Sequence, residues 1–316
     1  MDKCSISVIM PAYNVENYIC ETLDSLANQT QAPDEIIIIN DGSSDNTSAL
    51  IRSHELMSNI KFIETENNGQ GIARNIGVKE AKSEYLYFFD SDDLLTEDFI
   101  EQSKKILISN DKPDIYLFSG KSFFDPMLKN SGFNPYYIRS FEGKYNNQQY
   151  FFDKLLKEPE LSCSPCLYLS KRSLWCNNKL AFNSFYHEDE ELFYPLLFNA
   201  STYVISKEVF FLRRIRSDST MTNKKEVKHA EGQGAILSSL LEMIDKGNYD
   251  KFGTKLIRRR LGLFYLSYVS VSINSGKSIN FILLVRSILA SRSVKAPLKA
   301  IKRIVKPLKI KTDEKN

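Results

Sequence analysis

Tyr85-Leu-Tyr-Phe-Phe-Asp-Ser-Asp-Asp93 is the stretch that decides the fold. Its first five residues are apolar and aromatic, which is typical of a buried strand. The three carboxylates that follow are costly at a strand end unless a cation or hydrogen-bond donors neutralise them. Side chains two apart on an extended backbone point the same way, so we expect Asp90 and Asp92 to converge. Hard divalent ions bind through one or two carboxylates and substrate phosphates, so this junction predicts a metal-assisted phosphate site.

Taken alone, the four residues 90–93 favour a turn in which an aspartate caps a helix over 94–108. The rest of the N-terminal half reverses that preference, because strands and helices alternate along it. The predicted strands cover residues 5–10, 35–40, 60–63 and 85–89, and the predicted helices cover 18–28, 47–57 and 72–81. This order predicts an α/β fold with a mainly parallel sheet covered by helices.

Parallel sheets of this kind bind ligands at the C-terminal ends of their strands. Those ends carry Pro11-Ala-Tyr-Asn14, Asn40-Asp-Gly42 and Asp90-Ser-Asp-Asp93. We therefore expect three polar motifs to meet in one crevice. Further along, we expect strands at 114–119, 167–169, 203–205 and 209–213, helices at 147–157 and 190–199, and helical structure from 225 onward. Residues 123–147 are predicted to form a long irregular loop with short strands.

Composition excludes some classes of protein. The 42 basic and 39 acidic residues nearly balance, so no whole-protein field points to nucleic acid. The longest mainly apolar stretch, 261–273, is shorter than the roughly 20 residues that a membrane span needs. Met1-Asp-Lys-Cys4 forms no signal peptide, and five cysteines are an odd number, so a reducing cytoplasm is expected. The lone Cys163/Cys166 pair is interpreted as incidental rather than as a zinc or redox site.

The N-terminal half contains four sequence motifs, and their order and spacing are informative as well as their residues. They are Ser7-Val-Ile-Met-Pro-Ala-Tyr-Asn14, Ile39-Asn-Asp-Gly-Ser-Ser-Asp45, Gly71-Ile-Ala-Arg-Asn75 and Phe89-Asp-Ser-Asp-Asp93. Together they resemble the family-2 glycosyltransferases, which are nucleotide-sugar-dependent enzymes with the GT-A fold. Glu188-Asp189 before an amphipathic helix is a fifth, weaker match. The resemblance covers about residues 5–215. It implies a GT-A domain at 1–220, with a nucleotide-sugar half at about 1–120 and an acceptor half at about 121–220, and a helical extension at 221–316.

The resemblance also implies roles for individual residues. Asp41 would bind the uracil or an equivalent base, Arg74 would contact the nucleotide and Asp90 the ribose. Asp92 would hold Mn²⁺ or Mg²⁺ at the diphosphate, and Asp189 would be the general base of an inverting transfer. The base pocket would be lined by Pro11, Ala12 and Tyr13. Supporting roles are expected for Asn75, Asp93, Glu188, Arg213, Arg214, Arg216 and Ser219.

Ordinary structural roles remain open for several of these residues. Tyr13 could be half-buried packing, Asp41 an Asx-turn residue before a glycine, and Arg74 a partner in a surface salt bridge. Any one of the acids at 188–191 could simply begin a helix. Many relatives complete the metal shell with a histidine near the arginine cluster, and this sequence has none there, so a third protein ligand is left open. The residue before the Glu-Asp pair is often glycine in relatives and is His187 here.

We expect a sugar transferase that uses a nucleotide-sugar donor, with UDP as the expected nucleotide, and a glycan or lipid-linked acceptor of bacterial surface polysaccharide. A non-catalytic nucleotide-sugar or glycan-binding module is the alternative from another class. A sugar-phosphate nucleotidylyltransferase is disfavoured because Pro11-Ala-Tyr-Asn14 cannot serve as a glycine-rich phosphate loop.

The C-terminal tail has an amphipathic pattern. Apolar residues recur at helical spacing at 294, 298, 301 and 305 beside a stripe of lysines, and no acidic residue occurs between 286 and 312. This pattern predicts a peripheral contact with the inner face of the plasma membrane. A solvated helix docked on the enzyme, or a disordered end, is the alternative.

Overall fold

The computed structural model describes residues 4–125, 137–158, 161–216 and 227–292. The chain forms two compact units. The first contains Met1–Ser184 and Pro195–Asn223, and the second contains Phe185–Tyr194 and Lys224–Asn316. One helix, α7 (Glu188–Asn199), begins in the second unit and ends in the first.

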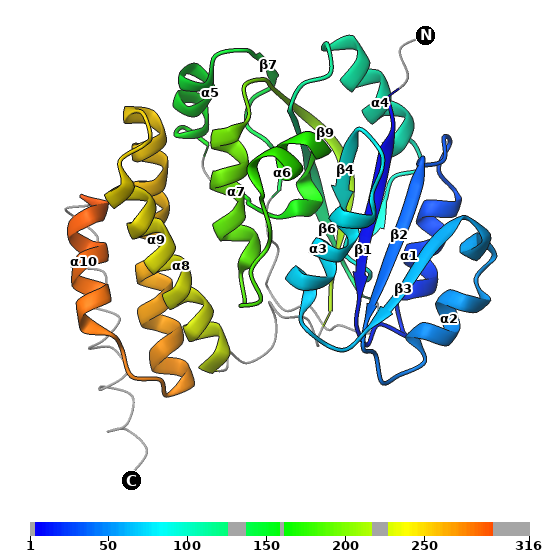
Figure 1. The fold of residues 1–316 in the computed structure, drawn as a ribbon, viewed down its shortest axis with the longest axis horizontal. Helices are drawn as coiled ribbons and strands as arrows, with labels where there is room; N and C mark the ends of the chain where they lie inside the picture. Colours follow the sequence, from blue (N-terminus) through cyan, green and yellow to red (C-terminus); the bar gives the residue numbers. More distant parts are fainter. Residues whose placement is uncertain (1–3, 126–136, 159–160, 217–226, 293–316) are drawn as a thin grey trace. The chain divides into compact units, whose positions relative to one another are not determined.

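The described part of the first unit is built on a nine-stranded sheet (Figure 1). Its strands are β1 (Ile6–Ala12), β2 (Glu35–Asp41), β3 (Ile60–Thr65), β4 (Tyr85–Phe88), β5 (Leu94–Leu95), β6 (Ile115–Phe124), β7 (Gly143–Tyr145), β8 (Tyr168–Lys171) and β9 (Tyr203–Ile215). Their spatial order is β3-β2-β1-β4-β8-β6-β9-β5, and β7 pairs with β9. The strands β3, β2, β1 and β4 run parallel to one another, whereas β8 pairs antiparallel with β4 on one side and β6 on the other.

Helices pack against this sheet. They are α1 (Ile19–Ala27), α2 (Thr47–Ser53), α3 (Gln70–Glu80), α4 (Phe99–Ser109), α5 (Gln148–Leu155) and α6 (Arg172–Asn178), with short 3₁₀ turns at Glu55–Asn59 and Pro165–Leu167. The apolar face of α1 presents Ile19, Leu23 and Leu26, and all three are buried. Helix α3 approaches β1 so closely that a Cβ added at Gly77 would lie 2.2 Å from the Cγ2 of Ile9. The sheet is therefore buried by helices, as the hydrophobic run of β2 predicts.

The predicted α/β class is confirmed, and its parallel part is the N-terminal block of four strands. Two local predictions need correction, and one helix was missed. Residues 94–95 form strand β5, paired with β9, and the helix predicted from 94 begins only at Phe99. The two strands predicted at 203–205 and 209–213 are one strand, β9, because the chain continues through an irregularity in its pairing with β6. Helix α6 was not predicted.

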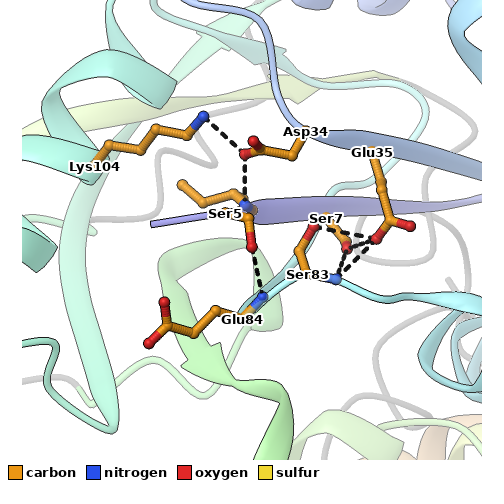
Figure 2. Close-up of polar contacts among 8 residues, drawn as sticks. Ser5, Ser7, Asp34, Glu35, Ser83, Glu84 and Lys104 are labelled. Atoms are coloured by element: carbon orange, nitrogen blue, oxygen red, sulfur yellow. Dashed lines mark hydrogen bonds and ion pairs between the residues drawn. The ribbon is translucent and has the colours of Figure 1, made fainter. Parts of the chain in front are cut away.

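A network of carboxylates ties the strands together at the N-terminal edge of the parallel block (Figure 2). The Asp34 Oδ2 atom accepts from the backbone N–H of the first residue of β1 at 2.9 Å and pairs with Lys104 Nζ at 2.7 Å. The Glu35 carboxylate accepts from the Ser7 hydroxyl, and from both the backbone N–H and the hydroxyl of Ser83. Burial alone would raise the pKa of Glu35, but these hydrogen bonds more than offset it, and the pKa is lowered.

Replacing Glu35 with glutamine should therefore weaken the fold in a pH-dependent way. We expect Glu35→Gln to lower the free energy of unfolding by about 1–2 kcal/mol at pH 7, because hydrogen bonds to a charged acceptor are lost. A carboxylate with a lowered pKa stabilises the fold fully above its unfolded pKa, and that contribution is lost as the pH falls through the folded value. The gap between variant and wild type should thus narrow below about pH 4.

Urea unfolding at a series of pH values measures this difference. Glu97→Gln, at an exposed acidic residue of the same unit, is the matched control and should be neutral. Equal stability of Glu35→Gln and wild type at pH 7 would contradict the role assigned to the network.

The second unit contains three helices, α8 (Val227–Lys246), α9 (Lys251–Ser275) and α10 (Phe281–Ser291), which pack against one another. Asp250 caps α9 by accepting from the N–H of Gly253 at 2.6 Å, and Asn280 caps α10 by accepting from the N–H of Leu283 at 3.0 Å. Among the described helices, none combines the length and apolar character that crossing a bilayer requires. The predicted tail helix lies outside the described residues.

Candidate active site

Three predicted motifs follow strands that are neighbours in the sheet. Strand β1 pairs in parallel with both β2 and β4, so the C-terminal ends of all three lie at one edge. Pro11 and Ala12 are the buried last residues of β1, and Tyr13 lies just beyond them with 48% of its surface exposed. Tyr13 is therefore not a core residue, and its ring can be reached from solvent.

Asp41 ends β2 and is 3% exposed. Its two carboxylate oxygens accept from the backbone N–H groups of Asn68 at 2.9 Å and Gly69 at 2.8 Å. The next residue, Gly42, has φ +72°, and a Cβ there would lie 2.7 Å from the backbone nitrogen of Asn67. Asp41 thus holds the loop that leads into α3 against the end of β2, and both of its oxygens take part.

Arg74 lies in the second turn of α3, because the helix begins at Gln70 rather than at the predicted residue 72. It is 2% exposed, and its Nη2 atom donates to Asp90 Oδ1 at 2.8 Å. Its guanidinium also lies 5.3 Å from the centre of the Phe182 ring. Arg74 does form a salt bridge, but not one on the surface: the arginine is buried, and its partner Asp90 is partly exposed. Asn75 binds the backbone N–H and C=O of Phe182, each at 2.8 Å.

The acidic motif is a turn and not an extended strand end. Strand β4 stops at Phe88, and the N–H of Asp93 bonds back to the C=O of Asp90. The alternation expected to aim Asp90 and Asp92 at one point is therefore wrong. Asp93 is buried; its pKa is raised by burial and by the neighbouring Asp92 and Asp90, and its Oδ1 accepts from the N–H of Arg214 at 2.7 Å.

Three arginines at the end of β9 surround this turn. Arg214 is 5% exposed; its Nε donates to the C=O of Asp92 at 2.9 Å and its Nη2 donates to Glu21 of α1 at 2.5 Å. Arg216 donates from Nε to Asp92 Oδ2 at 2.7 Å, and both guanidiniums lie over the ring of Tyr18. Two members of the predicted arginine cluster, Arg214 and Arg216, therefore bind the acidic turn itself.

Arg213 binds a different partner, donating to the Tyr137 hydroxyl at 2.6 Å. Burial lowers the pKa of Arg213, but Tyr137, Asp93 and Asp90 offset this and raise it, so the side chain stays charged. The three carboxylates of the turn, the three arginines and a tyrosine hydroxyl thus occupy one edge of the sheet. Ser219, the last member of the predicted cluster, lies outside the described residues.

The chemistry of the turn fits a divalent cation. Asp90 and Asp92 each bond to an arginine through one oxygen, and the second oxygen of each makes no hydrogen bond within the described residues. Mg²⁺ and Mn²⁺ accept one or two carboxylate oxygens when substrate phosphates supply the others. Among described residues, no three His, Cys, Asp or Glu side chains gather as a protein-only metal site. The side chains present therefore suit a cation that a diphosphate helps to hold.

Glu188 and Asp189 begin α7 in the part of it that belongs to the second unit. Glu188 is 1% exposed, whereas Asp189 is partly exposed and its Oδ1 accepts from the N–H of Glu190 at 2.9 Å. Glu190 itself pairs with Arg260 of α9. His187, just before the pair, has φ +70°, which is the left-handed region that favours glycine.

Sequence patterns missed several residues that build the site. Tyr18 and Glu21 on α1, Tyr137, and Phe182 all contact predicted site residues. Glu21 and Arg214 are 193 positions apart, and Asn75 and Phe182 are 107 apart. No local spacing in the sequence could reveal such pairs, because they arise from the order of strands in the sheet.

Known proteins resemble this chain in sequence. Residues 7–173 match the sequence profile of glycosyl transferase family 2. The glycosyltransferase GlyA of Streptococcus pneumoniae is 34% identical over 160 residues, which are 46% of this chain and 22% of that protein. The putative glycosyltransferase EpsH of Bacillus subtilis is 36% identical over 126 residues, 40% of this chain and 36% of that protein. The alignments thus span well under half the length of either relative.

Solved structures share the fold. Residues 1–349 of TarS from S. aureus, crystallised with UDP, superpose with a TM-score of 0.63 at 17% identity, covering 98% of this chain and 93% of that one. A mannosyltransferase from Pyrobaculum calidifontis, solved with GDP-Man and Mn²⁺, gives a TM-score of 0.59 at 15% identity, covering 98% and 88%. The chain belongs to glycosyl transferase family 2, and the predicted membership and fold are confirmed.

Proposed function

We propose that this chain transfers a sugar from a nucleoside-diphosphate donor, a UDP-sugar, to a hydroxyl group of a glycan or lipid-linked acceptor. The observation that supports it most is the Asp90–Asp93 turn, held between Arg74 on one side and Arg214 and Arg216 on the other. Acidic side chains with spare oxygens beside guanidiniums suit a diphosphate accompanied by a cation. TarS, whose structure was solved with UDP and with UDP-GlcNAc, shares this fold and lends support to a UDP-sugar.

Donor binding is assigned to the edge of the sheet. Tyr13, exposed just beyond β1, offers a flat face to a base. Asp41, buried at the end of the neighbouring strand β2, is proposed to bind the base through acceptor sites that its bonds to Asn68 and Gly69 leave. Arg74 is proposed to contact the nucleotide and Asp90 the ribose; their mutual bond at 2.8 Å, which keeps the two side chains together, supports this pairing of roles. A base would thus be held at β1 and β2 and a diphosphate at the turn after β4.

Asp92 would hold the cation, with Asp90 next to it along the turn. A bound divalent ion neutralises charge as the nucleoside diphosphate leaves. Arg216 already lies 2.7 Å from Asp92, so its cationic group would add to that neutralisation from the protein side. Asp189 is proposed to take the proton from the acceptor hydroxyl, with Glu188 orienting the loop. Attack opposite the leaving group would invert the anomeric centre.

The setting proposed for this reaction is surface polysaccharide synthesis at the inner face of the plasma membrane. The basic tail over residues 286–312, free of acidic side chains, supports attraction to anionic lipids. A non-catalytic nucleotide-sugar-binding module would have the same donor edge, so turnover separates the two functions. The names of the relatives, glycosyltransferases in each case, support turnover.

Donor binding is tested by calorimetric titration with UDP, GDP and CDP. We expect UDP to bind best and Asp41→Asn to weaken it by about tenfold or more, because a charge-assisted hydrogen bond is worth about 1.5–3 kcal/mol. Asp111→Asn, at a carboxylate that is 88% exposed, should leave the affinity unchanged.

Thermal unfolding of the same variants separates a lost ligand contact from a loosened loop, because Asp41 also binds Asn68 and Gly69. Unchanged UDP affinity in Asp41→Asn would remove Asp41 from the base site. Failure of the wild type to bind any of the three nucleotides would contradict the proposed donor class.

A further inference from the structure

Helix α10 has an apolar stripe on the side that faces away from α8 and α9. Its inner side is formed by Leu284, Ser287 and Ser291, which are buried. Its outer side exposes large apolar side chains at relative positions 0, 1, 4 and 8, which fall on one face of a helix. They are Phe281 at 66% exposed, Ile282 at 76%, Val285 at 52% and Leu289 at 71%.

This stripe differs from the other exposed apolar groups of the described residues. Those groups occur singly, one each on a loop, α4, β6, α5, α8 and α9: Tyr13, Ile108, Phe124, Tyr150, Val227 and Leu263. Single exposed apolar residues are normal on a protein surface, whereas a contiguous stripe marks a surface that binds something. The eleven-residue helix α10 has four such exposed side chains, and no other helix among the described residues has more than one.

Helices α9 and α10 themselves carry charges of one sign, and the acidic partner of Arg286 on α10 is Asp245 of α8. From residue 251 to residue 312 the sequence contains fifteen lysines and arginines and no aspartate or glutamate, so α9 and α10 have no acidic side chain. Arg292 directly follows α10, and Arg258 of α9 is close enough that burial and the charge of Arg292 both lower its pKa. Within the described residues no carboxylate pairs with either arginine. Two neighbouring like charges beside an apolar stripe call for an anionic partner.

We propose that the outer face of α10 docks on the surface of an anionic lipid bilayer, with Phe281, Ile282, Val285 and Leu289 entering the interface. Apolar side chains then lie at the boundary of the acyl chains while Arg258 and Arg292 lie near the phosphate headgroups. The docking site consists of described residues, and the basic sequence after residue 292 adds attraction of the same sign. This inference goes beyond sugar transfer and does not depend on it.

Other occupants fit the charges poorly. A second copy of the chain would bring together two surfaces whose helices α9 and α10 have basic but no acidic side chains, and like-charge juxtaposition is unfavourable. Residues 293–312 of the same chain, with seven basic and no acidic residues, would meet the same repulsion from Arg258 and Arg292. A nucleic acid would satisfy the arginines through its phosphates but would leave the apolar stripe in water. A bilayer surface offers apolar and anionic groups together.

Flotation with vesicles tests the docking surface in the full chain. We expect the wild type to bind vesicles that contain phosphatidylglycerol and to bind pure phosphatidylcholine much more weakly. Ile282→Gln combined with Leu289→Gln should reduce binding to the anionic vesicles by at least about tenfold, since two large apolar side chains no longer enter the interface. The matched control is Ile108→Gln combined with Tyr150→Gln, which removes two exposed apolar residues from α4 and α5 and should bind like wild type.

A photo-reactive benzoylphenylalanine in place of Ile282 identifies the occupant directly. Cross-links to lipid in the presence of vesicles would support the proposal. Cross-links to a second copy, or to residues 293–316 of the same chain, would overturn it, as would unreduced vesicle binding in the double variant. Binding of UDP by the double variant shows that it is folded. Loss of activity on nucleotide sugars with normal vesicle binding would concern the proposed transferase function alone.

Discussion

Asp92→Asn is expected to abolish turnover that depends on a divalent ion, with a loss of at least about 10³-fold, because a metal contributes several kcal/mol to the stabilisation of the leaving charge. Asp92 accepts from Arg216 through one oxygen at 2.7 Å, and its second oxygen makes no hydrogen bond to the described residues. An amide keeps the shape and can still accept from Arg216, but it lacks the charge that a hard cation requires. The rate of nucleotide-sugar hydrolysis against Mn²⁺ concentration measures the effect.

A neighbouring substitution sharpens this test. Asp93→Asn changes the same atoms one residue away, but the Asp93 carboxyl is buried and accepts from the N–H of Arg214, a bond that an amide oxygen can also accept. We therefore expect a much smaller loss from Asp93→Asn than from Asp92→Asn. If wild type is equally active with excess EDTA and with Mn²⁺, the metal role of Asp92 is wrong, whatever the variants show.

Asp189→Asn is expected to reduce turnover by about 10²–10⁴-fold while leaving the affinity for the nucleotide sugar nearly unchanged, as is usual when a general base is removed. Asp189 is partly exposed at the start of α7, whereas Glu188 is 1% exposed. A base must reach the hydroxyl of an incoming acceptor, and an accessible carboxylate meets that condition better than a buried one. Separate measurement of kcat and of donor affinity distinguishes lost catalysis from lost binding.

Glu188→Gln is the matched variant for this prediction. We expect it to lower stability, since it changes a buried carboxylate, and to lower kcat less than Asp189→Asn does. Normal turnover in Asp189→Asn together with an inactive but folded Glu188→Gln would move the role of base to Glu188.

The sequence predicted the parallel half of the sheet well because its signals are local. Four consecutive isoleucines in β2 and the aromatic run of β4 require burial on both faces, and both strands are central and buried. The position of the acidic motif at a strand end was likewise predicted, because the apolar run stops at a definite residue. Family strings then connected these positions to nucleotide sugars.

Partners of the site residues could not be predicted in the same way. The pairing of Arg74 with Asp90, and of Arg216 with Asp92, depends on how β4 and β9 are placed in the sheet. Strand alternation does not apply to residues 90–93, because they form a turn. In this turn, three carboxylates within four residues are neutralised by arginines and backbone N–H groups. The stripe on α10 was missed because an apolar helical face is read as core until a neighbour is shown to be absent.

Hydrolysis of nucleotide sugars by the wild-type chain tests the proposed transferase most directly. Purified protein is incubated with a panel of UDP-, GDP- and CDP-sugars and Mn²⁺ or Mg²⁺, and the release of nucleoside diphosphate is followed over hours. We predict slow release from a UDP-sugar that needs the divalent ion and falls to background in Asp92→Asn. Tight, saturable binding of the same nucleotide sugars with no release, and no transfer to any supplied glycan or lipid-linked acceptor, would contradict it and identify a binding module instead.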